Sequence, residues 1–231
     1  MTTAIIVAAG QGTRFGPDRD KLFFEVAGRP VVAHTWQRFE DCAGIDHIVL
    51  VIRDGMQTLF QELAGTYAFK KPYSFAVGGK ERQDSVWSGL DAAPSNTSIV
   101  AIQDGARPCT HLSIIESTIA AARESGAAVA AQAVTDTIKS SDTGITISGH
   151  LDRSKLWAVQ TPQCFRLTTI RHALSEVRQR GLLVTDDTAA CELIGQTVRL
   201  VPSAFPNPKV TMVSDLLFVE LLLNSARPGV V

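Results

Sequence analysis

A chain of 231 residues with 45% hydrophobic and 19% charged residues has the composition of one ordinary globular domain, expected here over residues 1–231. Its net charge is -1 and it has no basic tract, so the composition argues against a nucleic-acid partner. The longest late apolar run, residues 216–223, is too short to cross a bilayer, and we expect no membrane partner.

The cysteines are widely spaced and form no C-x-x-C pair: Cys42, Cys109, Cys164 and Cys191. This spacing favours reduced thiols over a zinc site or a disulfide framework. The chain enters its first apolar stretch at about Ala4 without a cationic leader, so a secretory signal is not expected. Together these features predict a cytoplasmic protein.

The first predicted strand begins near Ile5 and opens at Ala8-Ala9 into a loop rich in glycine. Bare glycine backbone exposes N–H groups that bind anions, and two cations, Arg14 and Lys21, flank the loop. The stretch is neither a dinucleotide fingerprint, because Phe15 stands where that motif needs glycine, nor a Walker A loop. We interpret it as a phosphate-binding loop. The alternative is a tight strand-to-helix turn with incidental surface cations.

Further strands and helices then alternate along the chain. Strands are predicted at 47–52, 73–77, 98–103 and 127–134, and helices at 30–40, 56–63, 83–93 and 112–124, the last closed by Gly126. Nearly continuous apolar strands are typical of a parallel sheet covered on both faces. The pattern predicts an α/β fold, a Rossmann-like doubly wound and mostly parallel sheet that binds ligands at the carboxyl ends of its strands.

The alternation breaks at about residues 135–160, where polar and apolar residues mix around a turn at 140–144. Thr137 and Lys139 on one side, and Ile145 and Ile147 on the other, suggest a projecting hairpin. The hairpin could be a lid, a dimerisation arm or an insertion without a function. Because an isolated two-stranded ribbon is only marginally stable in water, we expect another surface to cover it, and a partner subunit is the favoured candidate. Helices at 167–180 and 186–194, a strand at 197–201 and a helix from Ser214 complete the chain.

Two more loops follow predicted strands. Gly78-Gly79 precedes a helix that carries Ser85, and this backbone can read a flat base; the alternative is an ordinary helix N-terminus with acidic residues. Asp104 ends the strand at 98–103 and offers a hard oxygen to a magnesium ion on phosphates, unless it is a turn residue paired with Arg107.

Two later cations complete the candidate site. Arg153 lies at the foot of the hairpin, and Lys209 follows the stiff spacer Pro206-Asn207-Pro208. The five histidines are scattered, and we find no nucleophile elbow and no H-E-x-x-H motif. The strand-end loops and the later cations together predict a polyphosphate ligand.

An ordered set of motifs carries a family resemblance: A-A-G-x-G-x-R…K, G-G-x-E-R-x-x-S-V, D-G-A-R-P, V-x-D-T, D-R-x-x-L-W-x-x-Q-T-P-Q, T-D-D and P-K-V-T. From residue 5 to about 221 the chain closely resembles the 2-C-methyl-D-erythritol 4-phosphate cytidylyltransferases of isoprenoid synthesis. The resemblance implies a fold of the nucleotide-diphospho-sugar transferase type. It also implies cytidylyl transfer from CTP to a sugar-alcohol phosphate, magnesium, and a homodimer with a shared active site.

The resemblance also implies roles for individual residues. Arg14, Lys21, Arg153 and Lys209 would be catalytic. The nucleotide would contact Ala8, Ala9, Gly10, Gly12, Thr13, Gly78, Gly79, Ser85, Asp104 and Ala106, with Asp104 also serving the metal. The acceptor would contact Arg107, Thr137, Arg153, Thr161 and Lys209, with Thr137 and Arg153 supplied by the second subunit.

Three residues depart from the family pattern: Lys80, Pro206 and Pro208. Lys80 affects the side-chain contacts expected after Gly78-Gly79, and the two prolines affect the reach of Lys209. Ribitol 5-phosphate cytidylyltransferases share most of these motifs and give the alternative acceptor. A redox or non-catalytic nucleotide-binding module is the alternative of a different class. It is disfavoured because Arg14 and Lys21 are present and the second strand ends in Ile52-Arg53 rather than an acid.

Overall fold

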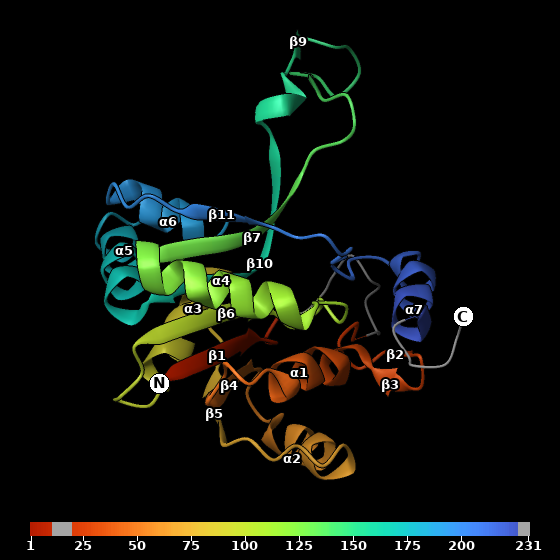
Figure 1. Cartoon of the computed structure of the whole chain (residues 1–231), viewed down its shortest axis with the longest axis vertical. Helices are drawn as coiled ribbons and strands as arrows, with labels where there is room; N and C mark the ends of the chain where they lie inside the picture. Colours follow the sequence, from red (N-terminus) through yellow and green to blue (C-terminus); the bar gives the residue numbers. More distant parts are fainter. Residues whose placement is uncertain (11–19, 226–231) are drawn as a thin grey trace.

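The computed structural model describes residues 1–10 and 20–225. One sheet runs in the order β11-β7-β10-β6-β1-β4-β5 (Figure 1). Its strands are β1 Thr2–Val7, β4 His47–Ile52, β5 Tyr73–Val77, β6 Ile99–Asp104, β7 Ala127–Ala133, β10 Trp157–Arg166 and β11 Arg199–Pro202. Neighbours pair in parallel except that β10 runs antiparallel to both β6 and β7. The predicted doubly wound, mostly parallel sheet is confirmed.

Helices cover both faces of this sheet. On one face lie α1 Val31–Asp41, α2 Gln57–Thr66 and α4 Leu112–Ser125, with α7 Asp215–Ser225 packed beside the short strand β2 Glu25–Val26. On the other lie α3 Arg82–Asp91, α5 Leu167–Gln179 and α6 Asp187–Leu193. Each set of helices shares one of two hydrophobic clusters with the sheet.

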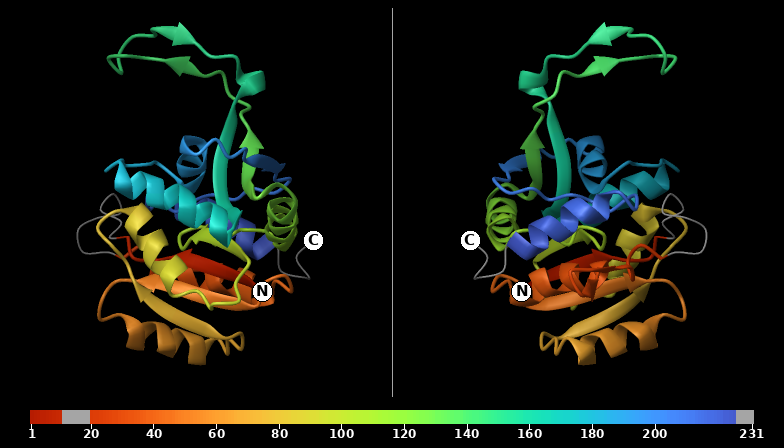
Figure 2. Two further views of the ribbon diagram at one scale, coloured as in Figure 1. Left: turned by 90° about the vertical axis from the view of Figure 1, so that its left-hand side faces the viewer. Right: turned by 90° about the vertical axis from the view of Figure 1, so that its right-hand side faces the viewer.

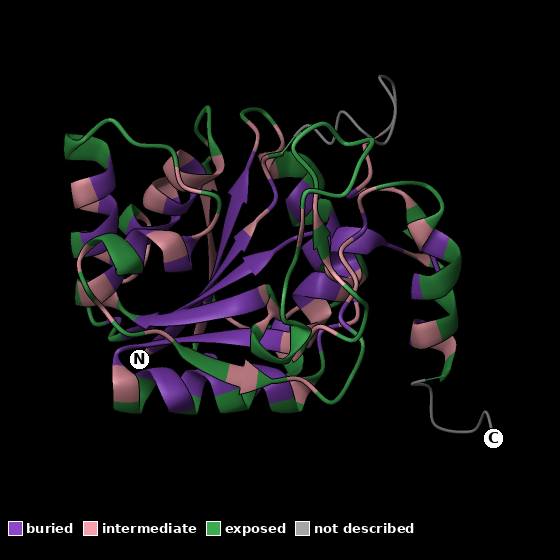
Figure 3. Cartoon of the chain, turned by 90° about the horizontal axis from the view of Figure 1, so that it is seen from above, coloured by how far each residue is buried: buried purple, intermediate pink, exposed green. Residues whose placement is uncertain are grey.

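The strand residues alternate between these clusters. In β4, Ile48, Leu50 and Ile52 enter the first cluster, whereas Val49 and Val51 enter the second. All five are fully buried, and the central strands form a buried layer between exposed helix faces (Figure 3). Side chains on both faces of these strands lie in apolar surroundings, which explains why the strand sequences are continuously apolar.

The predicted stop of α4 at Gly126 is confirmed. Gly126 has a φ of 89°, in the left-handed region that glycine adopts without strain, and its N–H donates to the carbonyl of Ala122. The chain enters β7 at the next residue.

Strand β10 was not predicted, although it lies between β6 and β7 in the sheet. Its sequence contains Pro162, which has no N–H for a ladder and argues against a central strand. The structure accommodates this proline at a register shift between Val159 and Gln163, with a cis Thr161–Pro162 bond. The proline therefore makes the sequence of β10 look like that of an irregular segment, which is why the strand was not predicted.

The predicted arm projects from the body of the molecule (Figures 1 and 2). Its paired part is short, with β8 Lys139–Ser140 against β9 Gly149–His150, followed by the 3-10 turn Arg153–Lys155. The expectation that Ile145 and Ile147 belong to the paired strands is wrong. They lie in the loop at the tip and are 89% and 70% exposed.

A second small hairpin, β2 Glu25–Val26 with β3 Arg29–Pro30, was also not predicted. Its turn residues Ala27 and Gly28 both have positive φ, at 50° and 77°, which is the geometry of tight hairpin turns. Within residues 1–10 and 20–225, no helix has the length and apolar character needed to cross a bilayer.

Candidate active site

A cavity of about 540 Å³ lies where β1, β5 and β6 end. It is lined by Val7, Ala9, Gly10, Lys21, Leu22, Gly79, Lys80, Glu81, Arg82, Ser85, Asp104, Gly105, Ala106 and Lys209. The three loops that the sequence analysis placed at strand ends therefore meet around one space, as expected of ligand sites in open α/β sheets.

The structure brings many of the predicted residues to this cavity. Ala9, Gly10, Lys21, Gly79, Ser85, Asp104, Ala106 and Lys209 line it. Ala8 is buried next to Ala9, and Gly78 packs against Ala9 and Ser85. Gly12, Thr13 and Arg14 lie outside the described residues, so their predicted roles stay predictions.

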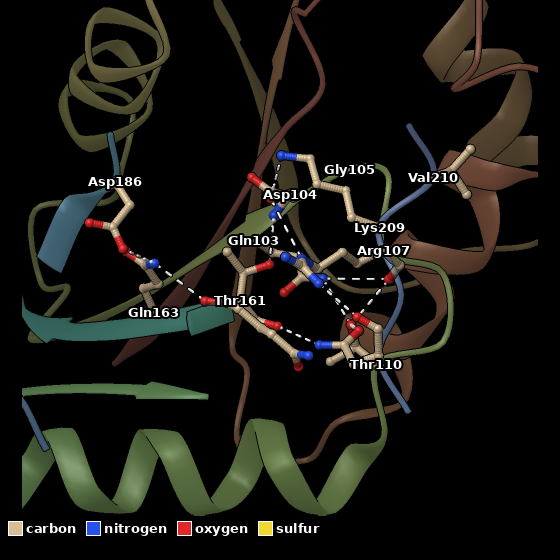
Figure 4. Close-up of polar contacts among 12 residues, drawn as sticks. Gln103, Asp104, Gly105, Arg107, Thr110, Thr161, Gln163, Asp186, Lys209 and Val210 are labelled. Carbon is tan, nitrogen blue, oxygen red and sulfur yellow. Dashed lines mark hydrogen bonds and ion pairs between the residues drawn. The ribbon is translucent and has the colours of Figure 1, made fainter. Parts of the chain in front are cut away.

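Asp104 is surrounded by cations. Its Oδ2 lies 2.8 Å from Lys209 Nζ and 3.6 Å from Arg107 Nε (Figure 4). Its Oδ1 lies 3.4 Å from Arg82 Nε. Burial alone would raise the pKa of Asp104, but Arg82, Lys209 and Arg107 outweigh burial and hold this pKa well below its usual range. The carboxylate is ionised at any physiological pH.

Lys209 reaches this position through Asn207, which is 2% exposed. The Asn207 amide donates to the carbonyl of Thr161 at 2.8 Å and accepts from the Thr110 hydroxyl at 3.0 Å. The Asn207 carbonyl accepts from Arg107 at 2.6 Å. These bonds fasten the proline-flanked spacer to β10 and to the start of α4, so the reach of Lys209 is fixed by Asn207 as much as by the prolines.

Lys21 also lines the cavity, and its ammonium donates to the carbonyl of Val210 at 3.1 Å. Val210 in turn donates its N–H to the carbonyl of Ala106 at 2.8 Å. Lys21 is thereby bonded to the residue that directly follows Lys209. Two ammonium groups face one cavity at the end of β6.

The Gly78-Gly79 loop is closely packed. The Gly79 N–H donates to Ser85 Oγ at 3.1 Å, and the Ser85 hydroxyl lies 3.2 Å from the carbonyl of Glu81, to which it donates. A Cβ added to Gly78 would lie 2.2 Å from the Ala9 Cβ. The glycine is required here because this loop and the first glycine loop touch.

Thr161 and the arm residues differ in their placement. Thr161 is 3% exposed, and its Oγ1 accepts from the Asp104 N–H at 3.1 Å, directly behind the cavity. Thr137 and Arg153 are exposed on the arm, and Arg153 donates to the carbonyl of Thr135. Neither arm residue lines the cavity of its own chain.

Sequence reasoning missed three residues. Arg82 lines the cavity and pairs with Asp104, Asn207 holds the spacer, and Asp187 pairs with Arg82 at 2.8 Å. Arg82 carried a clue, because a cation in the first turn of a helix opposes the helix dipole and needs a carboxylate partner. The contacts of Asn207 and Asp187 join distant segments and leave no local pattern.

No cluster of three or more His, Cys, Asp or Glu that fits a metal ion occurs in the described part of the chain. Two carboxylate residues, Glu81 and Asp104, are among the described residues that line the cavity, and Asp104 is the one paired with Arg82, Arg107 and Lys209. Magnesium usually binds through one or two carboxylates together with substrate phosphates. The residues present fit an ion carried by a nucleotide, with Asp104 as its protein ligand.

Comparisons with known proteins agree over nearly the full chain. The family described as 2-C-methyl-D-erythritol 4-phosphate cytidylyltransferase matches residues 2–225. The protein of that name from Alkaliphilus oremlandii (strain OhILAs) is 40% identical over 229 residues, which cover 99% of this chain and 97% of that protein. Its counterpart from Bacillus licheniformis is 41% identical over 223 residues, covering 96% of each.

Similar solved structures come from the same family of proteins. The 4-diphosphocytidyl-2C-methyl-D-erythritol synthase of Anaerococcus prevotii superposes with a TM-score of 0.85 at 28% identity, covering 96% of both chains. The 2-C-methyl-D-erythritol 4-phosphate cytidylyltransferase of Thermus thermophilus gives 0.79 at 28% identity, covering 97% of this chain and 100% of that one. The fold is that of an α/β nucleotidyltransferase. Within that class, the chain belongs to the 2-C-methyl-D-erythritol 4-phosphate cytidylyltransferase family.

Proposed function

We propose that this protein transfers a cytidylyl group from CTP to 2-C-methyl-D-erythritol 4-phosphate, giving 4-diphosphocytidyl-2-C-methyl-D-erythritol and pyrophosphate for isoprenoid synthesis. The observation that carries the proposal is the placement of Lys21 and Lys209 at one cavity, with Lys209 paired to Asp104 at 2.8 Å. Two polyanions must meet in this reaction, and fixed cations are what lower its barrier.

The acceptor needs no catalytic base. A phosphate monoester has a second pKa of about 6, so it is largely dianionic at neutral pH and can attack the α-phosphorus directly. An acceptor oxygen forms a bond to that phosphorus while the bond to the leaving pyrophosphate breaks. Lys21, Lys209 and Arg14 stabilise the charge that builds up on the phosphates. The absence of a histidine among the cavity-lining residues that the structure describes agrees with this chemistry.

The nucleotide binds in the cavity formed by the strand-end loops. Ala8, Ala9 and Gly10, with Gly12 and Thr13 beyond them, contact it. The backbone N–H groups after Ala8 bind its phosphates, since the Ala8 N–H donates to the carbonyl of Val51 at 2.7 Å. The base and ribose lie against Gly78, Gly79 and Ser85. The nucleotide also contacts Asp104 and Ala106. The close packing of Gly78 against Ala9 supports this assignment, because two adjacent loops can bind the base and the phosphates of one nucleotide.

Asp104 would hold a magnesium ion that accompanies the triphosphate, and the ion would neutralise phosphate charge. Lys209, which pairs with Asp104 at 2.8 Å in the ligand-free protein, would then contact phosphate. The ionised state of Asp104 and its position on the cavity wall support this assignment.

The acceptor phosphate binds to Arg107, Thr161 and Lys209 of one subunit and to Thr137 and Arg153 of the other. The two arm residues are exposed and absent from the cavity of their own chain, which supports a contribution to a second copy. The arm also exposes Ile145 and Ile147, which a partner subunit would cover. The chain then acts as a single catalytic domain whose arm, at about residues 135–160, forms a homodimer with shared active sites.

We assign the enzyme to the cytoplasm, because all four cysteines are free thiols. The proposed reaction is tested by ³¹P NMR of purified protein with CTP, magnesium and methylerythritol 4-phosphate. A new diphosphate diester signal should grow together with free pyrophosphate, and both should stop when EDTA is added. Pyrophosphate without the diester would indicate CTP hydrolysis and would contradict the proposal.

A further inference from the structure

Asp187, the first residue of α6, is a fully buried carboxylate that the proposed reaction does not use. Its Oδ2 accepts from Arg82 Nη1 at 2.8 Å, and its Oδ1 accepts no hydrogen bond from the described residues. Burial raises the pKa of Asp187 even though Arg82 opposes this. A buried pair of this kind is a weak source of stability, so its presence calls for another reason.

Arg82 connects this carboxylate to the cavity. Its guanidinium pairs with Asp187 through Nη1 and with Asp104 through Nε, at 3.4 Å from Oδ1. Burial would lower the pKa of Arg82, but Asp187 and Asp104 raise it above its ordinary value. The planar guanidinium has donors on several sides and can bridge two carboxylates, which an ammonium group does less well.

Asp187 is itself fixed to β10. The Asp187 N–H donates to Gln163 Oε1 at 3.1 Å. Gln163 Nε2 in turn donates to Asp186 Oδ2 at 2.9 Å (Figure 4). Asp186 caps α6 by accepting from the Ala189 N–H at 2.9 Å. Two residues before Gln163, Thr161 accepts from the backbone of Asp104. Strand β10 therefore holds Asp104 from two sides, directly at its backbone and through α6 and Arg82 at its side chain.

We propose that Asp187 is a positioning residue that fixes the Arg82 guanidinium, so that Asp104 presents Oδ2 to the cavity. This inference rests on the proposed function. Without the Asp187 charge, Arg82 has Asp104 as its single carboxylate partner, and this one contact does not fix the guanidinium. The carboxylate that faces Lys209 and the nucleotide is then no longer held in one orientation, and preorganisation for the transition state is lost.

The kinetic test uses Asp187→Asn, which removes the charge at nearly constant volume. We expect kcat to fall at least tenfold while KM for CTP stays within threefold. In an Asp104→Asn background the same change should alter kcat less than twofold, because the group that Asp187 positions is gone. Asp91→Asn, in the Arg171 pair away from the cavity, is the control and should retain wild-type kcat. Wild-type kcat in Asp187→Asn, or equal losses in both backgrounds, would overturn the proposal.

A second readout needs no turnover. Hydrogen exchange of the Arg82 Nε–H, followed by NMR in the ligand-free protein, should be at least fivefold faster in Asp187→Asn than in the wild type and unchanged in Asp91→Asn. Asp187→Ser is used if the asparagine variant does not fold. Equal exchange in variant and wild type would overturn the positioning role. Failure of the wild type to convert CTP would instead contradict the proposed function and leave the exchange result to decide the role of Asp187.

Discussion

Lys209 Nζ lies 2.8 Å from Asp104 Oδ2 and joins the end of β6 to the segment before α7. Asp104 and Lys209 are far apart in the sequence, so their contact depends on tertiary structure. The contact depends on Asn207, which anchors the spacer, and on Thr161, which accepts from the Asp104 backbone. The cavity is therefore formed by segments that are distant in the sequence, and we expect substitutions at Asn207 or Thr161 to alter it.

Lys21→Ala should lower turnover by hundreds-fold or more with folding intact, since removal of one preorganised donor costs on the order of 3–4 kcal/mol of transition-state stabilisation. The measurement is kcat of the purified protein, with folding checked by circular dichroism. Lys70→Ala, at an exposed lysine outside the cavity, is the control. A folded Lys21→Ala protein with near-normal turnover would refute the role of Lys21.

Gly78→Ala should abolish productive CTP binding, because the new Cβ would fall 2.2 Å from the Ala9 Cβ and 3.1 Å from Ser85 Oγ. Thermal shift with CTP measures the effect: the wild type should be stabilised and the variant should not. Gly65→Ala is the matched control, since a Cβ added at that position in α2 would lie in open space. Gly65→Ala should keep CTP binding and gain about 0.4–1 kcal/mol of stability. CTP stabilisation preserved in Gly78→Ala would argue against the nucleotide subsite.

Asp104→Asn should reduce the free energy of unfolding at neutral pH by about 2–4 kcal/mol, because Arg82, Arg107 and Lys209 lose a shared carboxylate. The folded pKa of Asp104 is depressed below its unfolded value of about 3.9. Its contribution is therefore fully present above about pH 4 and is lost as pH falls through the folded pKa. Urea unfolding from pH 7 to pH 3 should show a difference between wild type and variant that shrinks below pH 4. A difference that grows toward acid would contradict the ion-pair account.

Arg153→Ala and Lys21→Ala subunits should complement each other when mixed. If the arm serves the neighbouring cavity, a hybrid dimer contains one site with both defects and one site with neither. Partial activity should then return after subunit exchange, which native mass spectrometry can verify. Demonstrated exchange without recovery would count against acceptor binding across subunits.

The sequence predicts the sheet well where local chemistry decides the outcome. β4 and β5 have the predicted bounds, because continuous apolar runs bounded by polar residues have few alternatives. β10 was missed because its proline-containing sequence forms a strand only between β6 and β7. The strand-end loops were located because parallel strands bring their carboxyl ends together, whereas the roles of Arg82, Asn207 and Asp187 depend on long-range contacts that no local pattern encodes.

The most direct test of the central claim is magnesium-dependent pyrophosphate release from CTP, with methylerythritol 4-phosphate and ribitol 5-phosphate offered side by side. We predict a strong preference in kcat/KM for methylerythritol 4-phosphate. Equal use of both acceptors, preference for ribitol 5-phosphate, or no release with either would contradict it.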